Sequence, residues 1–124
     1  MTDLEGRALD EALARAMGWQ PVPGYSSVWN LPDGSVEAGP PWHVDLTYLL
    51  RDIEPVCREG GMKYWMVGVE EYEKPKKAYY AHTEPNPANA DFYGPTAATA
   101  LARAFLAVLT TRGERKSPPL LTGS

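Results

Sequence analysis

Three stretches of the chain repeat apolar residues at helical spacing, and this pattern constrains the fold more than any other feature. They run from Leu4 to Met17, from Leu46 to Cys57 and from Ala97 to Val108. In each stretch the apolar residues fall on one face, as they do in helices that cover a core. The sequence therefore predicts three amphipathic helices.

Local signals place the ends of the first two helices. Thr2 followed by Glu5 is typical of a capping box that begins the first helix, and Gly18 suits a left-handed stop after it. Asp45 is the expected N-cap of the second helix. Pro55 lies inside that helix and removes one backbone hydrogen bond, so either the helix kinks or its last turn is separate; we expect a kink.

Two runs rich in aromatic and β-branched residues, 62–73 and 77–83, predict an antiparallel hairpin. Earlier in the chain, Val28–Leu31 and Ser35–Glu37 flank Pro32-Asp33-Gly34, whose residue types suit a tight turn. A small hairpin or an ordered loop is expected there.

These elements predict an α+β fold, with three helices packed around a short antiparallel sheet in the order α-β-α-β-β-α. At 124 residues the chain has the usual length of one domain, which we place at residues 1–110. The polar, proline-containing segment 111–124 is expected to be a flexible tail.

Composition excludes several function classes. A net charge of -4 argues against a protein that binds duplex nucleic acid by neutralising many phosphates. No stretch is long and apolar enough for a membrane span, and the N-terminus does not resemble a signal peptide. The single cysteine, Cys57, cannot form an internal disulfide and is expected to be buried. We therefore expect a cytoplasmic protein.

The start of the third helix is the most suggestive local feature for binding. Gly94-Pro95-Thr96 opens this helix with proline at its first helical position, where the missing N–H costs nothing. Free N–H groups, the helix dipole and the hydroxyls of Thr96 and Thr99 favour an anion beside Tyr93. The alternative is a well-capped helix with a purely structural role.

Aromatic residues are numerous for so short a chain, and several lie in predicted loops or at strand ends. Trp29, Trp42 and Trp65 are candidates to stack on the flat part of a ligand, because aromatic faces stack on nucleobases. The alternative is that most of the aromatic residues pack in the core or anchor loops.

His43, Asp45 and His82 form the only histidine–carboxylate set, and it is weak as a metal site because such a site needs three or four converging ligands. No nucleophile lies in a recognisable motif. We therefore predict no catalytic residue, no metal and no cofactor. The predicted ligand-binding residues are Trp29, Trp42, His43, Asp45, Trp65, Tyr93, Thr96 and Thr99.

Several short motifs carry a resemblance to a known family. They are Leu4-Glu5-Gly6-Arg7-Ala8-Leu9-Asp10, Ala16-Met17-Gly18-Trp19, the segment from Trp42 to Asp45, and Tyr93-Gly94-Pro95-Thr96 with Ala102-Arg103-Ala104. Over residues 3–109 the chain resembles the small phage and prophage proteins grouped as the phage α/β/α-sandwich domain, relatives of NinX. It departs from them in the proline-rich segment 21–41 and in Pro55.

The resemblance implies a small phage accessory protein that acts in the cytoplasm of the bacterial host. Our first hypothesis is a non-catalytic counter-defence protein that sequesters a phosphate-bearing, nucleotide-derived molecule. The alternative is an inhibitor that binds a host defence protein, and a second alternative is an enzyme that processes a nucleotide. Self-association fits the first two hypotheses.

Overall fold

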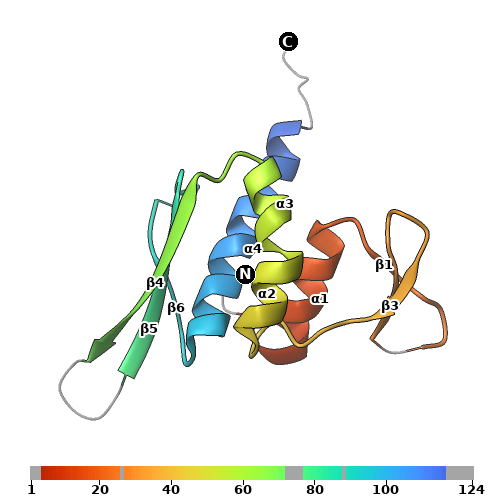
Figure 1. The fold of residues 1–124 in the computed structure, drawn as a ribbon, viewed down its shortest axis with the longest axis horizontal. Helices are drawn as coiled ribbons and strands as arrows, with labels where there is room; N and C mark the ends of the chain where they lie inside the picture. Colours follow the sequence, from red (N-terminus) through yellow and green to blue (C-terminus); the bar gives the residue numbers. More distant parts are fainter. Residues whose placement is uncertain (1–3, 26, 72–76, 88, 117–124) are drawn as a thin grey trace.

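The computed structural model describes residues 4–25, 27–71, 77–87 and 89–116 (Figure 1), and it confirms an α+β fold in which helices pack against antiparallel sheet. The described residues form more elements than expected, including two three-stranded sheets instead of one. The elements are α1 (Gly6–Ala16), β1 (Gln20–Pro21), β2 (Val28–Asn30), β3 (Val36–Ala38), α2 (Leu46–Asp52), α3 (Glu54–Glu59), β4 (Tyr64–Glu71), β5 (Lys77–Glu84), β6 (Phe92–Gly94) and α4 (Ala97–Lys116).

Helix α4 is the centre of the molecule. It lies between the sheet of β4, β5 and β6 on one side and α1, α2 and α3 on the other (Figure 1). Its alanines let neighbouring backbones approach closely, while Leu101 and Phe105 are fully buried among them. The helix is therefore apolar around much of its circumference, as expected for an element covered from several directions.

Helix α1 buries Leu9 and Leu13 against α4, which agrees with its apolar spacing. It ends as predicted, because Gly18 has a φ of 89°. Its start differs from the prediction: the N-cap is Glu5, and the side chain of Glu5 makes no capping hydrogen bond. The expected capping partner Thr2 lies outside the described residues.

The second helical region divides into α2 and α3 at Ile53, so our expectation of a kink is wrong and the separate last turn is observed. Pro55 lies in the first turn of α3, where a backbone N–H has no partner within the helix. Starting a new helix there therefore removes the cost of a proline. Asp45 caps α2 as predicted, and its Oδ1 accepts a hydrogen bond of 2.9 Å from the N–H of Thr47.

Helix α4 begins later than predicted. Its first helical residue is Ala97, and Thr96 caps it through a 3.1 Å hydrogen bond from the N–H of Thr99 to the Thr96 hydroxyl. Pro95 therefore precedes the helix and does not occupy its first position. The helix continues to Lys116 and so includes the first residues of the predicted tail; residues 117–124 lie outside the described part of the chain.

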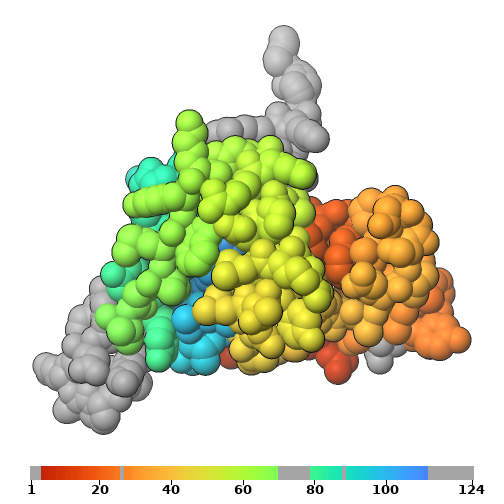
Figure 2. All heavy atoms as spheres, in the orientation of Figure 1, coloured from red at the N-terminus to blue at the C-terminus, as the bar shows by residue number. Residues whose placement is uncertain are grey.

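The predicted β4–β5 hairpin is present, and the segment expected to be a small hairpin or an ordered loop is also a hairpin; each is extended by a short third strand. Strands β2 and β3 pair antiparallel across the predicted turn, and β1 adds to the other side of β2, giving sheet A. Strands β4 and β5 pair over eight residues each, and β6 adds to β5, giving sheet B. In the space-filling view, sheet A forms a lobe beside α1 and α2, on the opposite side of the molecule from β4 (Figure 2).

Candidate functional site

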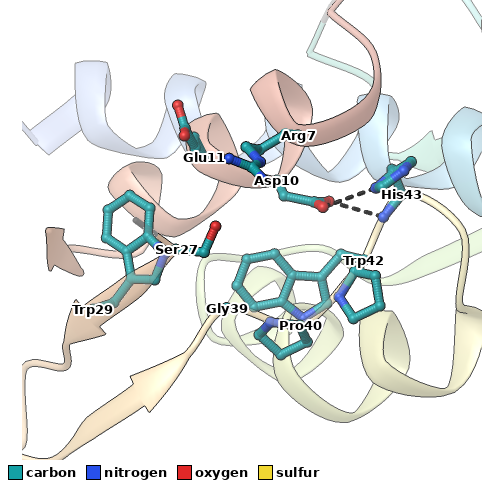
Figure 3. Close-up of a pocket in the computed structure, with 10 residues that line it drawn as sticks. Arg7, Asp10, Glu11, Ser27, Trp29, Gly39, Pro40, Trp42 and His43 are labelled. Carbon is teal, nitrogen blue, oxygen red and sulfur yellow. Dashed lines mark hydrogen bonds and ion pairs between the residues drawn. The ribbon is translucent and has the colours of Figure 1, made fainter. Parts of the chain in front are cut away.

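A pocket of about 230 Å³ lies between α1 and the segment that leads from sheet A into α2 (Figure 3). Helix α1 contributes one wall with its polar face. Sheet A and the Gly39–His43 segment contribute the other, which is mostly apolar. The lining residues are Arg7, Asp10, Glu11, Ser27, Trp29, Gly39, Pro40, Pro41, Trp42 and His43.

The pocket is organised around a carboxylate–imidazole pair. Asp10 Oδ2 lies 2.8 Å from Nδ1 of His43, and Asp10 Oδ1 accepts a 2.9 Å hydrogen bond from the backbone N–H of the same residue. Figure 3 shows the Asp10 carboxylate turned toward His43, with both contacts on one side. One carboxylate therefore fixes both the backbone and the ring of His43.

Burial controls the ionisation of this carboxylate. Loss of solvent raises the pKa of Asp10 above its usual 3.8, and the hydrogen bonds and positive charge from His43 oppose that rise. Glu11, the next residue on α1, adds a smaller like-charge repulsion in the same direction as burial. Asp10 consequently holds a proton more readily than an exposed aspartate does.

A chain of hydrogen bonds joins this pair to the start of α4. The carbonyl oxygen of His43 accepts a 2.8 Å bond from the hydroxyl of Thr99, which in turn accepts a 3.1 Å bond from the hydroxyl of Thr96. The two threonine hydroxyls that we predicted to favour an anion are thus used within the protein. They connect α4, His43 and α1 in one network.

Two tryptophans form the apolar part of the pocket, and both are almost fully buried. Trp42 is 1% exposed and Trp29 is 5% exposed. The indole N–H of Trp42 donates a 3.0 Å hydrogen bond to Asp52, and its ring meets Trp19 edge-on with centroids 5.3 Å apart. The guanidinium of Arg15 lies 5.6 Å from the centroid of the Trp29 ring. Both rings are held rigidly, so the pocket is largely preformed.

One cation in the pocket is available for a ligand. Arg7 is exposed, and its guanidinium makes no hydrogen bond or ion pair with any other described residue. A positively charged group of a bound molecule would lie near the carboxylate of Asp10, which is on the same helix as Arg7. The pocket therefore offers groups of both signs beside an apolar wall.

The structure brings together some of the predicted ligand-binding residues and separates others. Trp29, Trp42 and His43 line the pocket, and Thr99 with Thr96 lies directly behind it.

The other three predicted ligand-binding residues, Asp45, Trp65 and Tyr93, do not line the pocket. Asp45 caps α2, and Trp65 donates a 3.0 Å hydrogen bond to Glu54 and packs edge-on against Phe105. Tyr93 is on the open face of sheet B, where its ring centroid lies 6.3 Å from that of Tyr80.

Sequence reasoning missed Arg7, Asp10 and Glu11, the residues that α1 contributes. Their spacing marks them only as the polar face of an amphipathic helix, and such a face usually meets solvent. His43 lies 33 positions after Asp10, so no local signal could pair the two residues.

Reactive groups and metal ligands are sparse in the described chain. Within residues 4–25, 27–71, 77–87 and 89–116, no group of three or more His, Cys, Asp or Glu side chains is arranged to hold a metal ion. Ser27 lines the pocket with a φ of 61°, but Figure 3 places it beside Trp29, away from His43. His82, the other histidine, lies in sheet B between Glu84 and Asp91, at 2.7 and 2.8 Å.

Comparisons with family models, with curated proteins and with solved structures matched nothing. The resemblance to the phage α/β/α-sandwich domain therefore remains a prediction. Among the described residues, none of the helices has the length and apolar character needed to cross a membrane.

Proposed function

We propose that this protein captures a small phosphate-bearing, nucleotide-derived molecule in the pocket between α1 and sheet A. The observation that carries the proposal is the combination of an arginine with no ion pair to a described residue, a hydrogen-bonding carboxylate and a rigid apolar wall in one preformed pocket. Nucleotides present the matching groups: a phosphate, ribose hydroxyls and a flat base.

Each part of the pocket suits one part of such a ligand. Arg7 at the rim supplies a guanidinium, which binds phosphate with charge-assisted hydrogen bonds. Asp10 has oxygen lone pairs beyond the two that His43 uses, and carboxylates accept hydrogen bonds from ribose hydroxyls. Pro40 and Pro41, with the accessible edges of Trp29 and Trp42, provide the apolar surface for a base.

The volume limits how much of the ligand is enclosed. Pockets for whole drug-sized molecules usually measure about 300–1,000 Å³. At about 230 Å³, this pocket holds one portion of a nucleotide and leaves the remainder at the rim, near Arg7. In the phage setting that the resemblance implies, capture of this kind would remove a nucleotide-derived immune signal from the cytoplasm of the bacterial host.

Isothermal titration calorimetry with matched ligands tests the proposal. We expect cyclic dinucleotides or adenosine nucleotides to bind and the corresponding nucleosides to bind more weakly, because only the phosphate meets Arg7. Arg7→Ala should weaken nucleotide binding by about 10- to 100-fold, the equivalent of a lost charged hydrogen bond. Arg58→Ala is the matched control, since Arg58 pairs with Glu54 on α3, away from the pocket. Absence of heat with every nucleotide, or equal loss in both variants, would contradict the proposal.

The Asp10–His43 pair favours a second candidate, a nucleotide-processing enzyme. A carboxylate that orients an imidazole through Nδ1 leaves Nε2 as the proton-transferring atom. This candidate predicts product formation from a bound nucleotide, detectable by chromatography, and loss of turnover in His43→Gln. A ligand recovered unchanged after prolonged incubation supports capture.

A further inference from the structure

The outer edge of β4 is unprotected over its first six residues, because the charged residues of the strand, Glu70 and Glu71, stand at its hairpin end. Within the described residues β4 pairs only with β5, so alternate backbone N–H and C=O groups along it face outward. Residues 64–69 contain no charge and no proline. In the space-filling view this strand lies on the surface, in front of the rest of sheet B (Figure 2).

Apolar side chains are exposed on both faces of this strand. Tyr64 and Met66 are 44% and 41% exposed on the open face of sheet B, where β5 places His82 opposite Met66. Val69 is 51% exposed on the other face, the one that carries Trp65 and Val67 toward the helices. An uncharged edge with unsatisfied backbone groups and exposed apolar side chains is suited to pairing with another strand.

We propose that the occupant of this edge is a second copy of the same chain, with the two β4 strands pairing antiparallel about a two-fold axis at Val67. In this register Val67 faces its own copy, Met66 faces Gly68, and Trp65 faces Val69. The two copies of sheet B then form one six-stranded sheet. Such an interface closes on itself and does not propagate into a fibre.

The register follows from the side chains that need cover. Gly68 has no side chain, and the ring of Tyr80 lies over it so closely that an added Cβ would fall 2.7 Å from the ring. Met66 of the second copy would lie beside this ring, and thioether–aromatic contacts are favourable. On the other face, Trp65 of the second copy would cover Val69.

Other registers leave these groups in worse surroundings. A shift by two residues in one direction places charged Lys63 opposite Val69, and a shift in the other direction places Gly68 opposite Gly68, with no side chain to pack. A shift by one residue sets the open face of one copy against the helix-covered face of the other. The two-fold at Val67 avoids all three problems.

Charge favours a copy at this edge over a copy elsewhere on the surface. The chain carries a net charge of -4, so two copies repel each other where their carboxylates meet. Glu84 and Asp91, for example, flank His82 on the open face of sheet B, which disfavours face-to-face stacking of two copies. Residues 64–69 carry no charge, and in the proposed register Glu70 stands opposite Tyr64 and Glu71 opposite Lys63, so no two carboxylates face each other.

Sedimentation velocity on the full chain tests the proposal. We expect a reversible monomer–dimer equilibrium between about 10 µM and 1 mM, because pairing along one strand buries less surface than a standard stable interface. Met66→Lys and Val69→Lys each place like charges near the axis and should weaken dimerisation at least about tenfold. Val36→Lys is the matched control, since Val36 is an exposed valine on β3, an edge strand of sheet A.

Isotope-filtered NMR on a mixed sample of labelled and unlabelled chains tests the register, and the expected result is contact between the Met66 methyl group of one copy and the Tyr80 ring of the other. A monomer throughout the concentration range overturns the proposal. So does a dimer that Met66→Lys and Val69→Lys leave intact, or one that Val36→Lys weakens equally. Circular dichroism confirms that each variant is folded. The proposal is independent of the ligand pocket, because a monomer that binds nucleotides would overturn only the dimer.

Discussion

Replacement of Asp10 measures how strongly the carboxylate–imidazole pair holds α1 to the segment before α2. Asp10→Ala removes the acceptor of two contacts, the 2.9 Å bond from the His43 N–H and the 2.8 Å contact with His43 Nδ1. Each of the two His43 groups left without a partner costs about 1–3 kcal/mol, or about 2–6 kcal/mol together. Removal of the carboxylate also removes the unfavourable desolvation of its charge, which offsets part of that loss. We therefore expect Asp10→Ala to lower the free energy of unfolding by about 2–4 kcal/mol.

Asp10→Asn separates the contacts from the charge. The amide oxygen can accept from the His43 N–H, and the amide NH₂ can donate to Nδ1 of a neutral imidazole. Both contacts then survive without a buried charge, so the loss should be within about 1 kcal/mol. Urea unfolding followed by tryptophan fluorescence measures both variants, with Glu59→Ala as an exposed control on α3, away from the pocket.

The dependence on pH has a definite sign. Because burial raises the pKa of Asp10 in the folded protein, the folded state binds this proton more tightly than the unfolded state does. The contribution of Asp10 to stability is therefore fully present below the unfolded pKa of 3.8 and declines as pH rises through the folded pKa. The wild-type protein should lose stability relative to Asp10→Asn as pH rises through this range. An Asn variant as unstable as the Ala variant, or a trend with pH in the opposite direction, would refute this reasoning.

Four further predictions rest on packing and electrostatics. Gly94→Ala should lower the free energy of unfolding by about 1–3 kcal/mol, because its Cβ would lie 2.9 Å from a backbone nitrogen of α4. Gly68→Ala should cost less, because its Cβ meets only the end of the Tyr80 ring, which can move on the open face; equal losses in urea unfolding would contradict this. Hydrogen bonds that His82 donates to Glu84 and, to a smaller extent, to Asp91 raise its pKa above the usual 6.5. Stability from this group is therefore present below pH 6.5 and is lost as pH rises through the folded pKa, and NMR titration should show His82 titrating at higher pH in the wild type than in Glu84→Gln. The thiol of Cys57, fully buried, should react with Ellman's reagent only as fast as the protein opens, and rapid reaction of the folded protein would place it at the surface.

Features that depend on neighbouring residues could be predicted from the sequence. The helix period placed the buried faces of α1 and α4, the left-handed Gly18 ended α1, and Asp45 capped α2. The β4–β5 hairpin was also evident, because each strand is long enough to show its composition. The burial of Cys57 followed from its position on the apolar face of the second helical region.

Short elements and local competition were harder to predict. Strands β1 and β6 have two and three residues, too few for a periodic pattern, and they exist because β2 and β5 offer an edge for pairing. Pro55 correctly indicated that the second helical region is interrupted. Whether the helix bends or restarts there depends on how its two halves pack against α4.

The sequence by itself determined the main helical regions and the longer strands, because periodicity, caps and turns act over a few positions. Only the tertiary structure decided which polar residues meet. Asp10 and His43 belong to separate elements, and they come together because α1 and the segment before α2 both pack beside α4. The polar face of α1 became a pocket wall for the same reason: sheet A folds over it and makes part of an apparently solvent-facing surface concave. The outward edge of β4 likewise became evident only when strand order showed that no described strand covers it.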